Sequence, residues 1–234
     1  MRKILFFLSS AFFFMSNGLS GQVAGENLPY IPEYREQIPY FQELITGGQY
    51  AEPSSLIKGD PYYASRQFER GTLKINGITY PEVPLIYDCY RDQLVTFHPI
   101  FNQKILIKPE KIDGFSLSNG QMFRHFSGNE SYFRHGNGIY QVVGEGKAFA
   151  LAKRYKTTKA LRELSRFDEE YLEKGEFFIL KDNVFTSVKR PSDAYMALGL
   201  EPKVFKKELK AKGIQFKQNP EGFLSYLVSH PSLD

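Results

Sequence analysis

Between Gly71 and Val188 the sequence repeats one pattern, a short β-prone run followed by turn-forming residues. Asn76-Gly77 separates two such runs, and both central positions of a type I′ turn need positive φ, so this site predicts a β-hairpin. Further β-prone runs follow at 85–90, 94–98, 104–108, 112–117, 121–126, 138–143, 148–155, 176–181 and 184–188. About ten short strands at hairpin spacing predict a β-rich α+β fold whose antiparallel meander forms a barrel or a sandwich.

After Arg190 the pattern changes to short helices, which predicts a small C-terminal helical cluster over 191–234. Pro191, Pro202 and Pro220 stand where helices begin, and Gly199 and Gly213 stand where two of them end. The expected inward-facing residues are apolar. They are Val204, Phe205 and Leu209 in the second helix, and Phe223, Leu224, Leu227 and Val228 in the third.

The stretch from Lys156 to Glu173 is charged, with basic residues early and acidic residues late. It predicts a solvated excursion that joins two paired strands. A cluster of basic residues overlaps its start, and we interpret it as an exposed edge strand protected by lysines. The cluster consists of Lys147, Lys153, Arg154, Lys156 and Lys159.

The first residues have the three parts of a secretory signal peptide. Arg2 and Lys3 precede an apolar run from Ile4 to Met15, and small residues follow it. This run is too short for a transmembrane helix, which needs about 20 apolar residues. We expect cleavage after Ser20, with cleavage after Gly21 as the alternative. The chain is then exported to the periplasm or secreted.

Removal of residues 1–20 takes two positive charges from a formal net charge of +4, which leaves the mature chain too near neutral to indicate nucleic-acid binding. No later stretch is apolar enough to span a membrane. Residues 21–70 are irregular and rich in Tyr, Pro and Gly, and we expect them to wrap the β domain of 71–190. Cys89 is the only cysteine, so the fold has no internal disulfide.

The first part of the chain contains, in order, Gly59-Asp60-Pro61-Tyr62-Tyr63, Gly71-Thr72-Leu73 with Asn76-Gly77, and Leu85-Ile86-Tyr87-Asp88. Further along come Gly138-Ile139-Tyr140-Gln141-Val142-Val143 with Gly146-Lys147, and then Phe177-Phe178-Ile179-Leu180-Lys181-Asp182. These segments resemble the opening, the central hairpin and the stretch before the C-terminal helices of an uncharacterised family of exported β-rich proteins from Bacteroidota-type bacteria. The family has no assigned activity, so the resemblance implies export and a fold outline, and transfers no functional residue.

Cys89 is the first candidate nucleophile, because a reactive thiolate needs a base within hydrogen-bonding reach. Its nearest histidine is His98, which a hairpin register would place roughly 13 Å away. We therefore interpret Cys89 as a small buried side chain in a strand.

The repeats Phe123-Arg124-His125 and Phe133-Arg134-His135 are a second candidate site. If their hairpin loop centres on Glu130, His125 and His135 face each other about 5 Å apart and could bind a metal or an anion. A third ligand is missing, so the preferred interpretation is a polar, solvent-exposed hairpin.

Asp88 and Asp92 bracket a turn, and turn chemistry accounts for both carboxylates without acid–base catalysis. Phosphate-loop, serine-elbow and zinc motifs are missing from the sequence, so we assign no catalytic residue, cofactor or metal. The favoured function is a non-enzymatic module that binds an envelope protein. The alternatives are a barrel that carries a lipid or other apolar molecule, and a hydrolase with a site built from distant residues.

Overall fold

The computed structural model describes residues 42–45, 47–98, 101–162 and 166–230. The proposed signal peptide and the tail residues 21–41 lie outside these ranges. The described residues form eleven strands of a single sheet. They are β1 (Ile57–Lys58), β2 (Glu69–Ile75), β3 (Ile78–Asp88), β4 (Gln93–His98), β5 (Gln103–Leu106), β6 (Ile112–Ser116), β7 (Met122–His125), β8 (Ile139–Glu145), β9 (Phe149–Ala160), β10 (Glu169–Lys181) and β11 (Val184–Val188).

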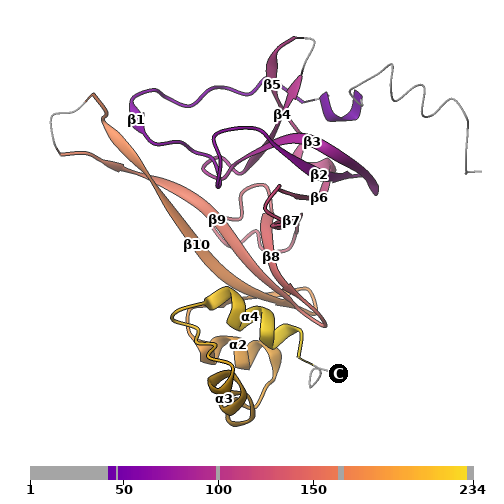
Figure 1. Cartoon of the computed structure of the whole chain (residues 1–234), viewed down its shortest axis with the longest axis vertical. Coiled ribbons are helices and arrows are strands. Elements are labelled where there is room, and N and C mark those ends of the chain that lie inside the picture. The colour runs from indigo at the N-terminus through magenta and orange to yellow at the C-terminus, as the bar shows by residue number, and fades with distance from the viewer. Residues whose placement is uncertain (1–41, 46, 99–100, 163–165, 231–234) are drawn as a thin grey trace, which may run out of the picture. The chain divides into compact units, whose positions relative to one another are not determined.

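The sheet is built from two antiparallel meanders, β2–β5 and β6–β11, which join where β2 pairs with β6 (Figure 1). Short β1 is the exception, because it pairs with β10 in parallel. The order β1-β10-β9-β8-β7-β6-β2-β3-β4-β5 has free ends, so the sheet is open. The prediction of a β-rich α+β fold is confirmed, and the expected single meander is interrupted once.

The hairpin predicted at Asn76-Gly77 is present, and both residues have positive φ (48° and 80°). The run that follows Asn76-Gly77 and the run expected at 85–90 form one strand, β3, instead of two. Glu82, with φ 55°, lies where the register of β3 against β2 shifts, so a bulge carries the strand past Pro81 and Pro84.

The expected excursion at 156–173 is wrong in its secondary structure, although it does join two paired strands. β9 continues to Ala160 and β10 starts at Glu169. Their register places Lys156 opposite Glu173 and Lys159 opposite Glu170. Opposite charges on facing positions stabilise a β-ladder, which explains why the basic residues come early and the acidic residues late.

Three helices follow the sheet, as predicted: α2 (Pro191–Leu198), α3 (Pro202–Ala211) and α4 (Pro220–Val228). Each begins at a proline, and Gly199 closes α2 with φ 71°. The inward face of α4 is confirmed, whereas Val204 of α3 is 61% exposed, because only Phe205 and Leu209 of that helix reach the core. None of the described helices combines the length and apolarity that a membrane crossing requires.

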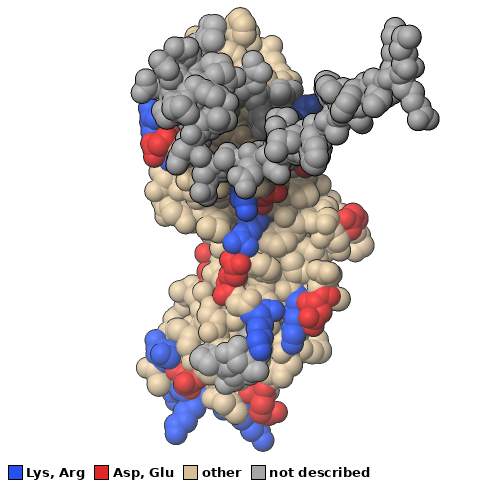
Figure 2. Space-filling model, turned by 90° about the vertical axis from the view of Figure 1, so that its right-hand side faces the viewer, with Lys and Arg blue, Asp and Glu red and all other residues tan. Residues whose placement is uncertain are grey.

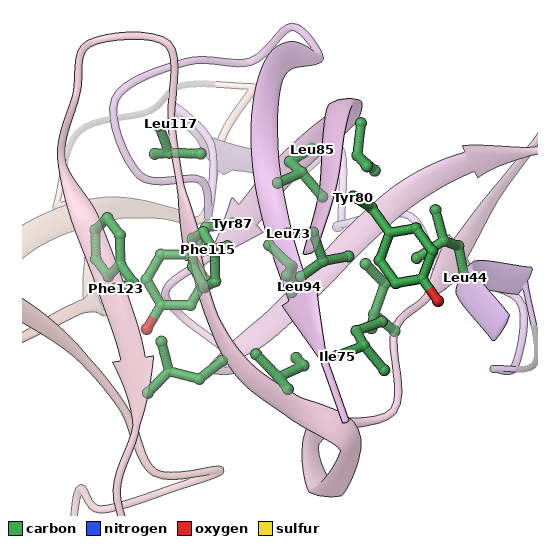
Figure 3. Close-up of a cluster of buried hydrophobic side chains, with 14 of the residues drawn as sticks. Leu44, Leu73, Ile75, Tyr80, Leu85, Tyr87, Leu94, Phe115, Leu117 and Phe123 are labelled. Atoms are coloured by element: carbon green, nitrogen blue, oxygen red, sulfur yellow. The ribbon is translucent and has the colours of Figure 1, made fainter. Parts of the chain in front are cut away.

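One hydrophobic core of the described residues is built mainly from strands β2, β3, β4, β6, β7 and β8 (Figure 3). Tyr87, Phe115 and Phe123 meet at its centre, with the Phe115 and Phe123 rings stacked 4.9 Å apart. Two short 3₁₀ helices border the sheet, η1 (Gln42–Ile45) and η2 (Pro109–Lys111). Leu44 of η1 packs into this core, so this described part of the tail contacts the β domain.

The far end of the sheet, β8 to β11, is covered on both faces. Ala150 and Ile179 pack against α2, α3 and α4, while Leu151 and Phe178 pack under residues of the loop 126–138. Because consecutive residues of a strand face opposite sides, residues 149–152 of β9 are all apolar, without the usual alternation.

Gly71 permits a close contact between β2 and β6. A Cβ added there would lie 2.1 Å from the carbonyl oxygen of Ser116. We expect Gly71→Ala to lower the free energy of unfolding by about 1–3 kcal/mol, because backbone must move to admit the methyl group. Urea unfolding measures the change. Gly48→Ala is the control, since nothing lies within 4 Å of that position, and equal losses in both variants would contradict the prediction.

Candidate functional site

The amine of Lys153 is buried in the middle of β9, where its side chain is 2% exposed. It donates to Asp92 Oδ2 at 2.7 Å and to the carbonyl oxygens of His135 and Ile139, each at 2.9 Å. Three acceptors satisfy the three ammonium hydrogens. Burial lowers the pKa of Lys153, and the carboxylate of Asp92 opposes this shift. The arrangement is that of a buried ion pair.

The prediction that Lys153 belongs to an exposed edge strand is wrong. β9 lies between β8 and β10, so it is an internal strand of the sheet. Other members of the basic cluster are also engaged. Lys156 donates to Asp60, and Arg154 donates to Gln141 and pairs with Glu221 of α4.

Asp92 connects the turn after β3 to the loop 126–138. Its Oδ1 accepts from the Tyr87 hydroxyl at 2.6 Å, and its Oδ2 accepts from the Asn137 backbone N–H at 2.5 Å. The Asn137 side chain returns a bond to the Asp92 carbonyl at 2.7 Å. Asp92 has φ 57°, a conformation that Asp and Asn adopt most readily after glycine. It is therefore more than the turn residue that its sequence context indicates.

The Tyr140 hydroxyl is the second polar centre under this loop. The Asn129 amide donates to it at 2.9 Å, and Nδ1 of His135 lies 3.0 Å away. Lys153 Nζ lies 4.9 Å from the centre of the Tyr140 ring. Burial raises the pKa of Tyr140 to about 12, whereas burial followed by the charge of Lys153 lowers the pKa of His135. His135 is thus held as a neutral hydrogen-bonding partner at pH 7.

The predicted alignment of His125 with His135 is wrong, because His125 pairs with Ile139. The residues between form successive turns, in which His135 N donates to the Tyr132 carbonyl and Gly138 N donates to the His135 carbonyl. These turns lengthen the loop and move His135 out of the ladder. Within the described ranges, no group of three His, Cys, Asp or Glu side chains is arranged to bind a metal ion.

Cys89 lies in the turn directly after β3 and is 2% exposed. Its thiol donates to the Pro61 carbonyl oxygen at 3.4 Å, and burial raises its pKa to about 12. At pH 7 Cys89 is therefore a protonated core residue. Its burial agrees with the sequence interpretation, whereas its placement in a strand is wrong, because β3 ends one residue earlier. His98 lies at the opposite end of β4, paired with Gln103.

Asp88 has the turn role predicted for it, because its Oδ1 accepts from the backbone N–H groups of Tyr90 and Arg91. The sequence pattern did not indicate its second contact. Oδ2 accepts from the Tyr50 hydroxyl at 2.7 Å, which fastens the described part of the tail to the end of β3. Burial raises the pKa of the Asp88 carboxyl, and these hydrogen bonds oppose the shift.

The best candidate for a binding site is an open cleft beside the loop 126–138, here called the Phe133 cleft. It has a volume of about 570 Å³. Its lining is largely aromatic and aliphatic, with one acidic and two basic residues. The lining residues are Phe133, Gly175, Glu176, Phe177, Ser187, Val188, Lys189, Phe216, Lys217 and Pro220. Three separate regions thus meet at one hollow, which local sequence patterns do not reveal.

Phe133 is 79% exposed, the largest exposure among the described large hydrophobic residues. The guanidinium of Arg134 lies 4.6 Å from the Phe133 ring centre and 4.2 Å from that of Tyr155. The neighbouring Tyr132 ring packs edge-on against Phe178 at 5.0 Å. These contacts hold Phe133 in place although it is exposed. The repeat Phe133-Arg134-His135 drew attention in the sequence for its histidine, whereas its phenylalanine faces the cleft.

Fold and cleft together define a β-rich α+β protein with an open sheet, a C-terminal helical cluster and an aromatic cleft. Comparisons with family models, curated proteins and solved structures returned no match. The resemblance to exported Bacteroidota-type proteins therefore stays a prediction.

Proposed function

We propose that this chain is an exported, non-enzymatic binding module and that the Phe133 cleft holds part of an envelope protein. One observation carries the proposal: a phenylalanine that is 79% exposed stands, supported by Arg134, at the rim of an apolar cleft. Aromatic anchors of this kind dominate the affinity of protein interfaces, and exposing them without a partner is unfavourable. The signal-like segment at 1–20 supports export.

The charges of the molecule fit a protein partner better than a polyanion. On the face shown in Figure 2, Lys and Arg side chains lie beside Asp and Glu side chains, without a field of one sign. Ion pairs such as Arg124 with Glu145 and Arg154 with Glu221 also neutralise basic groups among the described residues. Mixed charges surround many protein interfaces, whereas nucleic-acid sites need a continuous basic surface.

Native mass spectrometry of protein purified gently from its own envelope fraction tests the proposal. We expect the wild type to retain a partner protein and Phe133→Ala to lose it, because removing an aromatic anchor weakens binding by about 30-fold or more. Phe101→Ala is the matched control, since Phe101 is 66% exposed and lies outside the cleft.

Other outcomes would contradict the proposal. A small mass released on denaturation, equally in all three proteins, would identify a carrier instead. Turnover of an envelope substrate that a point variant abolishes would identify an enzyme. A monomer without a bound partner in every sample would contradict the proposal that the chain is a binding module.

A further inference from the structure

The outer edge of β10 is only partly paired. β9 pairs with β10 from Glu169 to Leu180, along almost its whole length. On the other side, β1 pairs with Glu169-Glu170 and β11 pairs from Phe177 onward. Between them, the segment 171–176 is paired with no described strand on that side. β1 lies at one end of β10 and the helices lie towards the other end (Figure 1).

Two observations show which backbone groups face this open edge. Leu161 N donates to the Asp168 carbonyl oxygen at 2.9 Å, so this carbonyl faces β9, although the Asp168 N–H donates to the carbonyl oxygen of Leu56 on the other side. Because the direction alternates along an antiparallel strand, Glu173 and Gly175 direct theirs away from β9. The two-residue turn at Asp182-Asn183, with φ 50° and 60°, joins the paired residues Lys181 and Val184. Lys181 therefore directs its backbone groups towards β11, and every second residue before it, including Gly175 and Glu173, directs them to the same side of β10.

The open edge leads directly into the Phe133 cleft. Glu173 and Gly175 are exposed, and Gly175 also lines the cleft together with Phe177 and Phe216. Unpaired backbone donors and acceptors thus adjoin an apolar hollow. This is the combination by which sheet edges bind extended peptides, with the backbone supplying affinity and the hollow supplying selectivity.

The charges of the cleft indicate an acidic occupant. Lys189 and Lys217 line it and are exposed, and no described carboxylate forms an ion pair with either. The one acidic residue of the lining, Glu176, already accepts from the Tyr155 hydroxyl at 2.8 Å. Two basic groups therefore remain to attract a carboxylate.

The gap also limits the form of the occupant. Residues 171–176 span roughly 20 Å, and β1 and β11 close the gap at its two ends. The β10 strand of a second copy is 13 residues long and would overlap one of these neighbours. A short extended segment fits, and a second copy of this edge does not.

We propose that the edge at 171–176 binds an extended, acidic peptide segment of the partner as an added strand. An apolar side chain of the segment enters the Phe133 cleft, and a carboxylate pairs with Lys189 and Lys217. This inference rests on the proposed function and names the chemistry of its partner.

A random library of seven-residue peptides, selected against the folded protein, tests the inference. We expect the enriched sequences to combine a bulky apolar residue with Asp or Glu. An enriched peptide, once synthesised, should slow hydrogen exchange at the Glu173 and Gly175 amides. Glu173→Pro, which removes one edge donor and blocks the edge, should raise its dissociation constant at least about tenfold, while Glu173→Ala, which keeps the N–H, should change it less than about twofold.

Charge reversal gives a second test that leaves β10 untouched. The double variant Lys189→Glu/Lys217→Glu should weaken the same peptide at least about tenfold, because both cations of the cleft become anions. If Glu173→Pro does not fold, this variant and the amide exchange of the wild type decide the question.

The outcomes separate this inference from the proposed function. One such outcome is a peptide that binds Phe133→Ala weakly, binds Glu173→Pro normally and leaves the Glu173 and Gly175 amides unprotected. This result would support binding in the cleft and overturn the added strand. Enrichment of basic or purely polar peptides, or no enrichment, would overturn the inference as well. Loss of the partner protein in Phe133→Ala would still support the proposed function in each of these cases.

Discussion

Replacement of Lys153 by Met lowers the free energy of unfolding by about 3–5 kcal/mol, because the carboxylate of Asp92 is left buried without its cation. The pair is 2.7 Å apart, and the two side chains are 2% and 10% exposed. Methionine keeps the length of the side chain, so lost packing contributes little. Two carbonyl oxygens, of His135 and Ile139, also lose their donor.

Urea unfolding followed by far-ultraviolet circular dichroism measures this effect, since the chain contains no Trp for fluorescence. Lys159→Met is the matched control on the same strand, where an exposed lysine should change stability by less than about 0.5 kcal/mol. The double variant Asp92→Asn/Lys153→Met should lose less free energy of unfolding than the two single variants lose in sum, because the two residues interact directly. Equal losses at positions 153 and 159 would contradict the buried pair.

Alkaline pH produces the second large effect. Tyr50, Tyr87 and Tyr140 are buried, and burial is the largest cause of the raised pKa of each, with Tyr140 reaching about 12. In the unfolded chain a tyrosine titrates near 10. Above that pH the unfolded state binds fewer protons than the folded state, so stability falls as pH rises.

Each buried tyrosine lowers the free energy of unfolding by about 1.4 kcal/mol per pH unit, and the three together lower it by about 4 kcal/mol per unit. Lys153 raises the stability as pH rises, because its pKa is lower in the folded chain than in the unfolded chain. This gain ends once the lysine of the unfolded chain has lost its proton, near pH 10.4. With the usual stability of 5–15 kcal/mol, we expect unfolding within a few pH units above 10.

A titration that records tyrosinate absorbance and circular dichroism together checks this prediction. The buried tyrosines should ionise only as the sheet unfolds. Tyr140→Phe is the comparison variant, and its alkaline slope should be smaller by about 1.4 kcal/mol per pH unit. Tyrosinate signals of all tyrosines that appear before the loss of circular dichroism would show that these side chains reach solvent in the folded protein.

Local patterns were sufficient for the elements whose conformation depends on neighbouring residues. The Asn76-Gly77 turn, the proline starts of α2, α3 and α4, and the glycine end of α2 follow from φ preferences and from the missing N–H of proline. The burial of Cys89 also agrees with the sequence interpretation, although the residue lies in the turn after β3 and not in the strand.

The conformation of the loop 126–138 determines which residues lie opposite His125 and where His135 lies. A loop centred on Glu130 would have paired His125 with His135, but the turns from Asn129 to Gly138 place Ile139 there instead. Those turns depend on Asp92, in the turn after β3, and on Lys153 of β9, which both bind the loop. A local pattern does not contain such contacts.

By itself, the sequence determined the β-rich class, the hairpin turns and the C-terminal helical cluster, because these depend on backbone preferences and on the spacing of apolar residues. Only the tertiary structure decided that β9 is internal, that Lys153 is a buried partner of Asp92, and that Phe133 borders a cleft with Phe177 and Phe216. The physical reason is that burial and ion pairing depend on residues brought together from distant parts of the chain, here 61 positions apart for Asp92 and Lys153.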